Sequence, residues 1–240
     1  MMNATFSAQA EKISSLLGLA DPPLAISFSN SEPDGVARFD AAMPERTQDG
    51  RTGRVPAGCV FWVEARDKTF TTIAEDHGNC SVGSLTHGFK TLDEAATGAD
   101  VAALVESEWV TPDVFPHIPS VAEKPDFVTY GPLADAQTEP DVVFIRVNGK
   151  QAMMLHDAWP ELRVEGKPQC HIIPIAKDRG EVALSVGCML SRVRTGISNN
   201  EMTCAIPASV LGELLQKLAT ANAADMKVAA YASADAKRFA

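Results

Sequence analysis

The chain has 240 residues, of which 45% are hydrophobic and 22% are charged, a globular composition that excludes a disordered or low-complexity protein. It carries 31 acidic and 21 basic residues, for a net charge of −10. This acidity argues against partners such as nucleic acid or anionic membrane, which require a basic surface.

The N-terminus has no basic region, and Glu11 and Lys12 interrupt any apolar stretch that a signal peptide would need. No apolar run approaches the ~18 residues of a membrane span. We therefore expect a cytoplasmic protein that does not enter membranes. In that compartment its five cysteines are expected to be reduced thiols, catalytic groups or metal ligands rather than disulfides.

The first half of the chain predicts a helix, a strand and a long loop. Apolar residues recur at helical spacing over residues 5–17, and Gly18 is a natural end for that helix. A strand is expected at 24–28, followed by a polar surface loop over 30–53, whose length is more typical of a functional loop. The remaining expected elements are strands at 60–63 and 69–74, a helix at 92–106 and a proline-rich, linker-like region at 112–125.

The second half repeats this mixture of strands and helices. Pro207 is a good first residue for a helix with an apolar stripe of five residues: Val210, Leu211, Leu214, Leu215 and Leu218. The remaining expected elements are strands at 142–147, 170–175 and 181–186, a tight turn at 147–150 and a helix at 152–159.

Two stretches of the chain share one pattern, which indicates an internal duplication. In each stretch, Ala stands six residues after a first cysteine, and a basic residue and Asp follow it directly. A second cysteine comes later, and a glycine stands eight residues after that second cysteine. The first cysteines are Cys59 and Cys170, offset by 111 residues, and the second are Cys80 and Cys188, offset by 108.

The duplication predicts an α+β fold made of two pseudo-symmetric α/β halves, residues 1–118 and 119–240, with mixed or antiparallel sheets flanked by helices. A single compact domain is the alternative. In either case a ligand site is expected where the halves meet, because pockets favour such junctions.

Cys80 and Cys188 each follow a strand and precede a segment that looks helical, in glycine-containing turns. The helix dipole would lower the pKa of a thiol at this position and favour the thiolate, which binds metals and attacks electrophiles. Gly83 would let a ligand approach the backbone. Arg192, or its neighbour Arg194, would clamp a carboxylate or phosphate beside the thiolate, although a solvated basic pair is the alternative.

If the halves pack about a twofold axis, Cys59, Cys80, Cys170 and Cys188 converge. Four thiolates are the ligand set of a zinc site or an iron–sulfur cluster, and His77, three residues before Cys80, could replace one ligand. The alternative is that these are buried apolar cysteines in strands, because free cysteine is among the most buried residue types.

The sequence resembles the DUF169 proteins of bacteria and archaea, an uncharacterised family. The resemblance is carried by 22-PPLAI-26, 58-GC-59, 76-DHGNCSVG-83, 130-YGPL-133, 140-PDVV-143 and 185-SVGC-188 with Arg192. This chain departs from the family pattern at Met189, where a glycine is expected. The resemblance implies that the cysteine turns matter and implies no activity.

Two functions follow as hypotheses. The first is a protein that binds a metal or cofactor through cysteine thiolates at the junction of the halves, for redox or metal chemistry. The second is a small-molecule binder or thiol sensor without metal. A third, in which the cysteines are core residues and the 30–53 loop carries the function, is the weakest. Nucleotide, nicotinamide and hydrolase motifs are absent from the sequence, and whether the protein is an enzyme or a homo-oligomer stays open.

Overall fold

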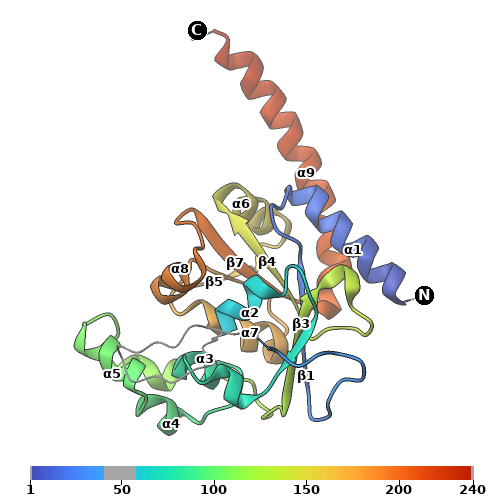
Figure 1. Cartoon of the computed structure of the whole chain (residues 1–240). Coiled ribbons are helices and arrows are strands. Elements are labelled where there is room, and N and C mark those ends of the chain that lie inside the picture. The colour runs from blue at the N-terminus through green and yellow to red at the C-terminus, as the bar shows by residue number, and fades with distance from the viewer. Residues whose placement is uncertain (1, 41–57, 239–240) are drawn as a thin grey trace.

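The computed structural model describes residues 2–40 and 58–238. In this part of the chain seven strands form one sheet in the order β2-β3-β1-β4-β7-β6-β5, with every neighbouring pair antiparallel except β5 and β6 (Figure 1). The strands are β1 (Leu24–Ser29), β2 (Phe70–Thr72), β3 (Phe127–Pro132), β4 (Val142–Asn148), β5 (Arg163–Glu165), β6 (Ala183–Ser185) and β7 (Glu201–Pro207). The expected mixed sheet flanked by helices is confirmed.

Helices cover both faces of this sheet. The helices are α1 (Met2–Leu17), α2 (Gly58–Glu64), α3 (Ser81–Thr86), α4 (Leu92–Ala96), α5 (Ala99–Glu106), α6 (Gly149–Ala158), α7 (Ile172–Arg179), α8 (Met189–Thr195) and α9 (Ala208–Ala236). Short 3₁₀ helices lie between them at η1 (Ala74–His77), η2 (Pro112–His117), η3 (Leu133–Asp135) and η4 (Gln169–His171).

The two faces of the sheet build two separate cores. In β4, Val142 and Phe144 pack toward α2 and α7, whereas Val143, Ile145 and Val147 pack toward α1, α6 and α9. This division follows from the alternation of side chains along a strand. The apolar run of β4 is continuous because both of its faces are covered.

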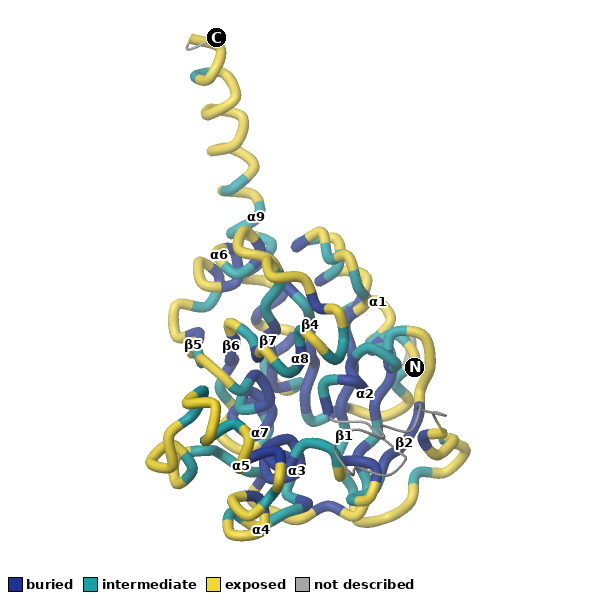
Figure 2. Tube along the Cα trace, turned by 60° about the vertical axis from the view of Figure 1, so that its left-hand side comes forward, coloured by how far each residue is buried: buried dark blue, intermediate teal, exposed yellow. Residues whose placement is uncertain are grey.

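The helices expected at both ends of the chain are confirmed. Helix α1 ends before Gly18, whose φ of +65° suits a residue without a side chain. In α9, four leucines of the predicted stripe are buried, while Val210 is half-buried. Beyond Leu218 the helix leaves the body of the molecule and is largely exposed (Figure 2).

The strands expected at 60–63 and 170–175 are wrong, because both segments are helical in the structure. Residues 60–63 belong to α2, and residues 170–175 form η4 and the start of α7. Short apolar runs rich in β-branched residues do not distinguish a strand from a fully buried helix. Both helices lie flat on the sheet and bury most of their residues, as Phe61 and Ile173 illustrate.

Other elements differ in detail. The helix expected at 92–106 is two helices, α4 and α5, and strands β3, β5 and β7 were not predicted. The turn expected at 147–150 is instead the start of α6, capped by Asn148. Within the loop expected at 30–53, Arg38 forms a bridge with Thr71 of β2. Residues 41–57 of that loop lie outside the described part.

The sheet has a symmetric strand order about its centre, where β1 pairs with β4. Outward from β1 come β3 and β2, and outward from β4 come β7 and β6. In sequence, α2 and α3 flank β2 just as α7 and α8 flank β6. An internal duplication would produce this order of elements. The duplication itself stays a prediction. Strand β3 pairs with β1 and β2, although it follows the expected boundary at residue 118.

Candidate functional site

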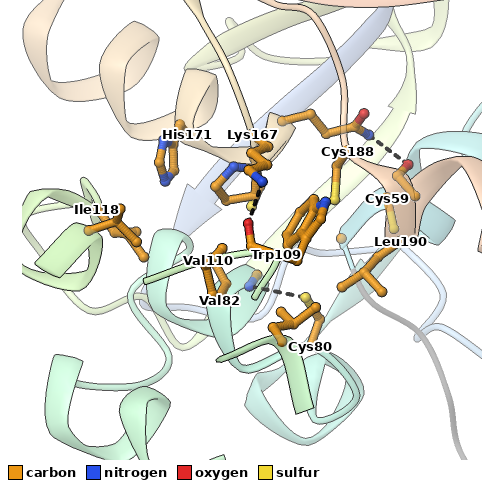
Figure 3. A pocket seen from close by; sticks show the side chains of 18 of the residues that line it. Cys59, Cys80, Val82, Trp109, Val110, Ile118, Lys167, His171, Cys188 and Leu190 are labelled. Atoms are coloured by element: carbon orange, nitrogen blue, oxygen red, sulfur yellow. Dashed lines mark hydrogen bonds between the residues drawn. The ribbon is translucent and has the colours of Figure 1, made fainter. Parts of the chain in front are cut away.

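Four cysteines that are far apart in the sequence line one cavity of about 260 Å³. Cys59 comes from α2, Cys80 from the start of α3, Cys170 from η4 and Cys188 from the start of α8. Figure 3 shows three of them, Cys59, Cys80 and Cys188, near Trp109 and Leu190. We refer to this space, on the α2/α3/α7/α8 side of the sheet, as the four-cysteine cavity.

The walls of the cavity are mostly apolar and come in large part from the segment between α5 and β3. Trp62 forms part of the wall from α2, and Leu190 from α8. Further apolar residues of the wall are Val82, Leu104, Trp109, Val110, Val114, Phe115 and Ile118. Of these residues, Val114, Phe115 and Ile118 lie in the proline-rich region at 112–125 that was expected to be linker-like, and they line the cavity instead.

Cys80 and Cys188 begin helices, as predicted. Cys80 is the N-cap of α3 and its Sγ accepts a hydrogen bond from the Gly83 N–H at 3.4 Å. Cys188 is the N-cap of α8, without a hydrogen bond from its side chain to that helix. Gly83 also lines the cavity beside Cys80. Both helices have fewer than eight residues, so each thiol lies at the N-terminus of a helix with a short run of aligned peptide dipoles.

Burial dominates the acidity of these thiols. It raises the pKa of Cys59 to about 12, helped by the nearby Cys80 charge and opposed by Arg194. Burial likewise raises the pKa of Cys80, although Arg194 and the Gly83 N–H favour its thiolate, and it holds that of Cys170 well above the usual range. The expected lowering of the Cys80 pKa is therefore wrong, because desolvation outweighs the helix dipole.

Hydrogen bonds connect the lining across the cavity. The Gln169 side-chain amide donates to Ser191 Oγ at 2.8 Å, and the Ser191 hydroxyl is in turn a hydrogen-bond partner of the Cys59 thiol. Gln169 lies on η4, Ser191 on α8 and Cys59 on α2, so this chain of bonds joins three elements.

Arg192, expected to bind a ligand, does not line the cavity. Its guanidinium donates to the carbonyl oxygens of Val186 at 2.9 Å and Glu201 at 3.0 Å, and also to that of Ser198. Arg192 thus ties the turn before α8 to the loop before β7. Arg194, two residues further on, does line the cavity, with its Nη2 donating to the Asn79 carbonyl at 3.3 Å.

His77, expected as a metal ligand, lies in the core beneath the cavity and not on its wall. Its ring is fully buried against Phe61 and Phe89, and its Nε2 pairs with the Thr72 hydroxyl at 3.0 Å. The histidine that lines the cavity is His171, next to Cys170. Burial lowers the pKa of His171 to about 4, so the ring is neutral at pH 7.

The four-cysteine cavity brings thiols to one space without forming a compact ligand set. Within residues 2–40 and 58–238, no three His, Cys, Asp or Glu side chains are grouped closely enough to hold a metal ion. Cys204, the fifth cysteine, is buried on the opposite face of the sheet, as expected of a core residue.

The model of the DUF169 family, described as uncharacterised ArCR, matches residues 12–217. The chain belongs to this family, as its cysteine turns indicated. The match covers every element that lines the cavity. No curated protein and no solved structure matches the chain. None of the helices in the described part is long and apolar enough to cross a membrane.

Proposed function

We propose that this chain binds a small, largely apolar molecule in the four-cysteine cavity. The observation that carries the proposal is the cavity itself, with apolar walls and with thiols contributed by helices from both halves of the chain. Its volume of about 260 Å³ is just below the ~300–1,000 Å³ of pockets for drug-sized ligands, which favours a small ligand. A cytoplasmic location, in which thiols stay reduced, is part of the proposal.

The state of the thiols fits such a ligand. Because burial raises the pKa values of Cys59, Cys80 and Cys170, these side chains are protonated at pH 7. A protonated cysteine behaves as a small hydrophobic group with a weak donor. The thiols therefore extend the apolar wall, and an apolar ligand can lie against them without desolvating charges.

A neutral fluorescent probe, N-phenyl-1-naphthylamine, tests this proposal. Its emission should rise when it enters the cavity of the wild-type protein. Leu190→Trp should abolish the rise, because the added rings fill the space beside the thiols. The matched control on the same helix is Val193→Trp, since Val193 is 79% exposed and does not line the cavity. This control should bind the probe like the wild type.

Absence of probe binding in the wild type would contradict the proposal, as would unchanged binding in Leu190→Trp. If Leu190→Trp does not fold, as judged by circular dichroism, Val110→Trp fills the same cavity from a loop. The same two outcomes then apply to that variant.

A second candidate is ligation of zinc or an iron–sulfur cluster, favoured by the four cysteines on one cavity. Binding would require the thiols to move closer together and to lose their protons. The test is metal analysis and an absorbance spectrum after anaerobic purification, on the wild type and on Cys80→Ala with Cys188→Ala. Metal in the wild type that is lost in the double variant would support this candidate, and metal-free wild type would contradict it.

A further inference from the structure

Arg194 brings an unused hydrogen-bond donor to the four-cysteine cavity. Its Nη2 donates to the Asn79 carbonyl, but its Nη1 is buried and has no hydrogen-bond partner. Among residues 2–40 and 58–238, no carboxylate forms an ion pair with Arg194. A partly buried guanidinium without an ion-pair partner is costly, so its presence on a cavity wall points to an anionic partner that residues 2–40 and 58–238 do not supply.

A second donor on the same wall also has no partner. Trp62 is only 2% exposed and lines the cavity, and its indole Nε1–H makes no hydrogen bond. An indole N–H can only donate, and the same is true of a guanidinium. The unsatisfied groups of the wall therefore require an acceptor. The buried Nε2 of the neutral His171 ring, also without a partner, accepts or donates according to its tautomer.

Against the effect of burial, the Cys80 side chain and the Asp100 carboxylate raise the pKa of Arg194. Asp100 forms no ion pair with it, however, and both Asp100 oxygens already accept hydrogen bonds from Ser81. The thiols of Cys59 and Cys80 stay protonated, because burial raises their pKa values. Glu108 lines the cavity but is exposed, so water screens its carboxylate. The other cation of the wall, Lys167, donates to the Trp109 carbonyl and lies 4.2 Å from the centre of the Trp109 ring.

We propose that the ligand of the four-cysteine cavity is a small monocarboxylate, whose carboxylate binds Arg194 Nη1 while its apolar part lies against the tryptophans and aliphatic residues of the wall. This inference rests on the proposed function and adds the chemical class of the ligand. A single charge matches the single free guanidinium. A phosphate monoester would carry a second charge into an apolar space without compensation.

Displacement of N-phenyl-1-naphthylamine by two near-isosteric compounds tests the inference. At pH 7.5, 3-phenylpropanoate should displace the probe from the wild type at a concentration at least about tenfold lower than 3-phenylpropanamide does, because a charge-assisted hydrogen bond is stronger than a neutral one. Arg194→Met keeps the aliphatic stem and removes the charge, so it should bind the probe but show no more than about a twofold preference. Arg179→Met, the control for loss of a cation outside the cavity, removes an exposed arginine at the end of α7 and should keep the tenfold preference.

Each other outcome counts against a specific statement. Equal displacement by both compounds in the wild type, or failure of both to displace bound probe, would overturn the monocarboxylate and leave the binding cavity standing. A preference that survives in Arg194→Met would overturn the role of Arg194. Stronger displacement by 3-phenylpropylphosphonate would overturn the single charge. Wild-type protein that binds neither the probe nor either compound would instead contradict the proposed function. If Arg194→Met does not fold, Arg194→Gln replaces it with the same expectations.

Discussion

At the scale of single residues, the interior of this protein holds many ionisable groups in their neutral forms. His77 and His87 are fully buried with their ring centres 5.2 Å apart, and burial also raises the pKa values of Cys59, Cys80 and Cys170. Burial disfavours the charged form of each. The sequence shows which residues are ionisable, but it does not show how far each will be removed from water.

His87 makes stability depend on pH. Burial lowers its pKa to about 4, against 6.5 in the unfolded chain, although its hydrogen bond with the Gly83 carbonyl opposes this. The contribution is complete above pH 6.5, where both states are neutral. It is lost as the pH falls toward 4, because only the unfolded state takes up the proton. The free energy of unfolding should fall by about 3 kcal/mol over this interval from His87 alone.

Urea unfolding at pH 7.5, 6.0 and 4.5 measures this effect. His87→Gln should have a clearly weaker dependence on pH than the wild type. The control is His156→Gln, because His156 is exposed on α6, and this variant should follow the wild-type profile. Identical profiles for His87→Gln and the wild type would show that His87 is not held neutral by the fold.

At the scale of elements, the sequence predicted those whose pattern is local and missed those that depend on tertiary contacts. The helical spacing in α1 and α9 and the apolar run of β4 needed no knowledge of the rest of the fold. Strand β5, which was not predicted, has three residues, too few for a period to show. The short helices α2 and α7 exist because the sheet buries them from one side.

The candidate site was predicted to a similar extent. The repeated cysteine pattern indicated four thiols at one place, and the structure brings these four to one cavity. Which of Arg192 and Arg194 lines the cavity, and whether His77 does, depends on the rotation of short helices, which the sequence leaves undefined. The apolar wall around Trp109 was missed because its residues lie in irregular structure, which has no period.

The start of α6 offers a test of how neighbouring elements are joined. Asn148 Oδ1 accepts from the Gln151 N–H at 3.0 Å, and Gln151 Oε1 accepts from the Asn148 N–H at 2.7 Å. The Gln151 amide also donates to the carbonyl oxygens of Leu17 and Gly18, at the end of α1. Gln151 therefore caps one helix and ties it to another.

Asn148→Ala should lower the free energy of unfolding by about 1 kcal/mol, the usual cost of losing an N-cap. Gln151→Ala should cost more, about 2 kcal/mol, because it also leaves the buried Leu17 carbonyl group without a donor. Thermal and urea unfolding measure both values. An Asn148→Ala variant that is less stable than Gln151→Ala would mean that the connection to α1 adds nothing.

At the scale of the whole molecule, strands β1 to β3 and strands β4 to β7 belong to one sheet, and a network of charged side chains connects them. Arg146 of β4 pairs with Asp21 at 2.9 Å and with Glu201 of β7 at 2.8 Å, and Asp21 also pairs with Arg66 at 3.1 Å. The network connects the turn before β1, the residues that follow α2, and strands β4 and β7. The Arg146 side chain is 12% exposed, so water screens these pairs only in part.

Arg146→Met should lower the free energy of unfolding by about 3 kcal/mol, because it leaves two partly buried carboxylates without their shared cation. Arg163→Met serves as the comparison. Arg163 pairs with Glu165 and Glu181, but its side chain is 42% exposed, so its loss should cost less than about 1 kcal/mol. Urea unfolding at low and moderate salt measures both, and equal costs would contradict a structural role for the network.

The central claim for the molecule is that thiols from helices of both halves of the chain line one ligand-binding cavity. Isotope-coded alkylation with iodoacetamide, followed by mass spectrometry, measures the reaction rate of each cysteine with and without saturating N-phenyl-1-naphthylamine. The prediction is that the probe slows Cys59, Cys80, Cys170 and Cys188 together and leaves Cys204, on the far face of the sheet, unchanged. Unchanged rates at all four cavity cysteines with bound probe, or slowing of Cys204 instead, would contradict the claim.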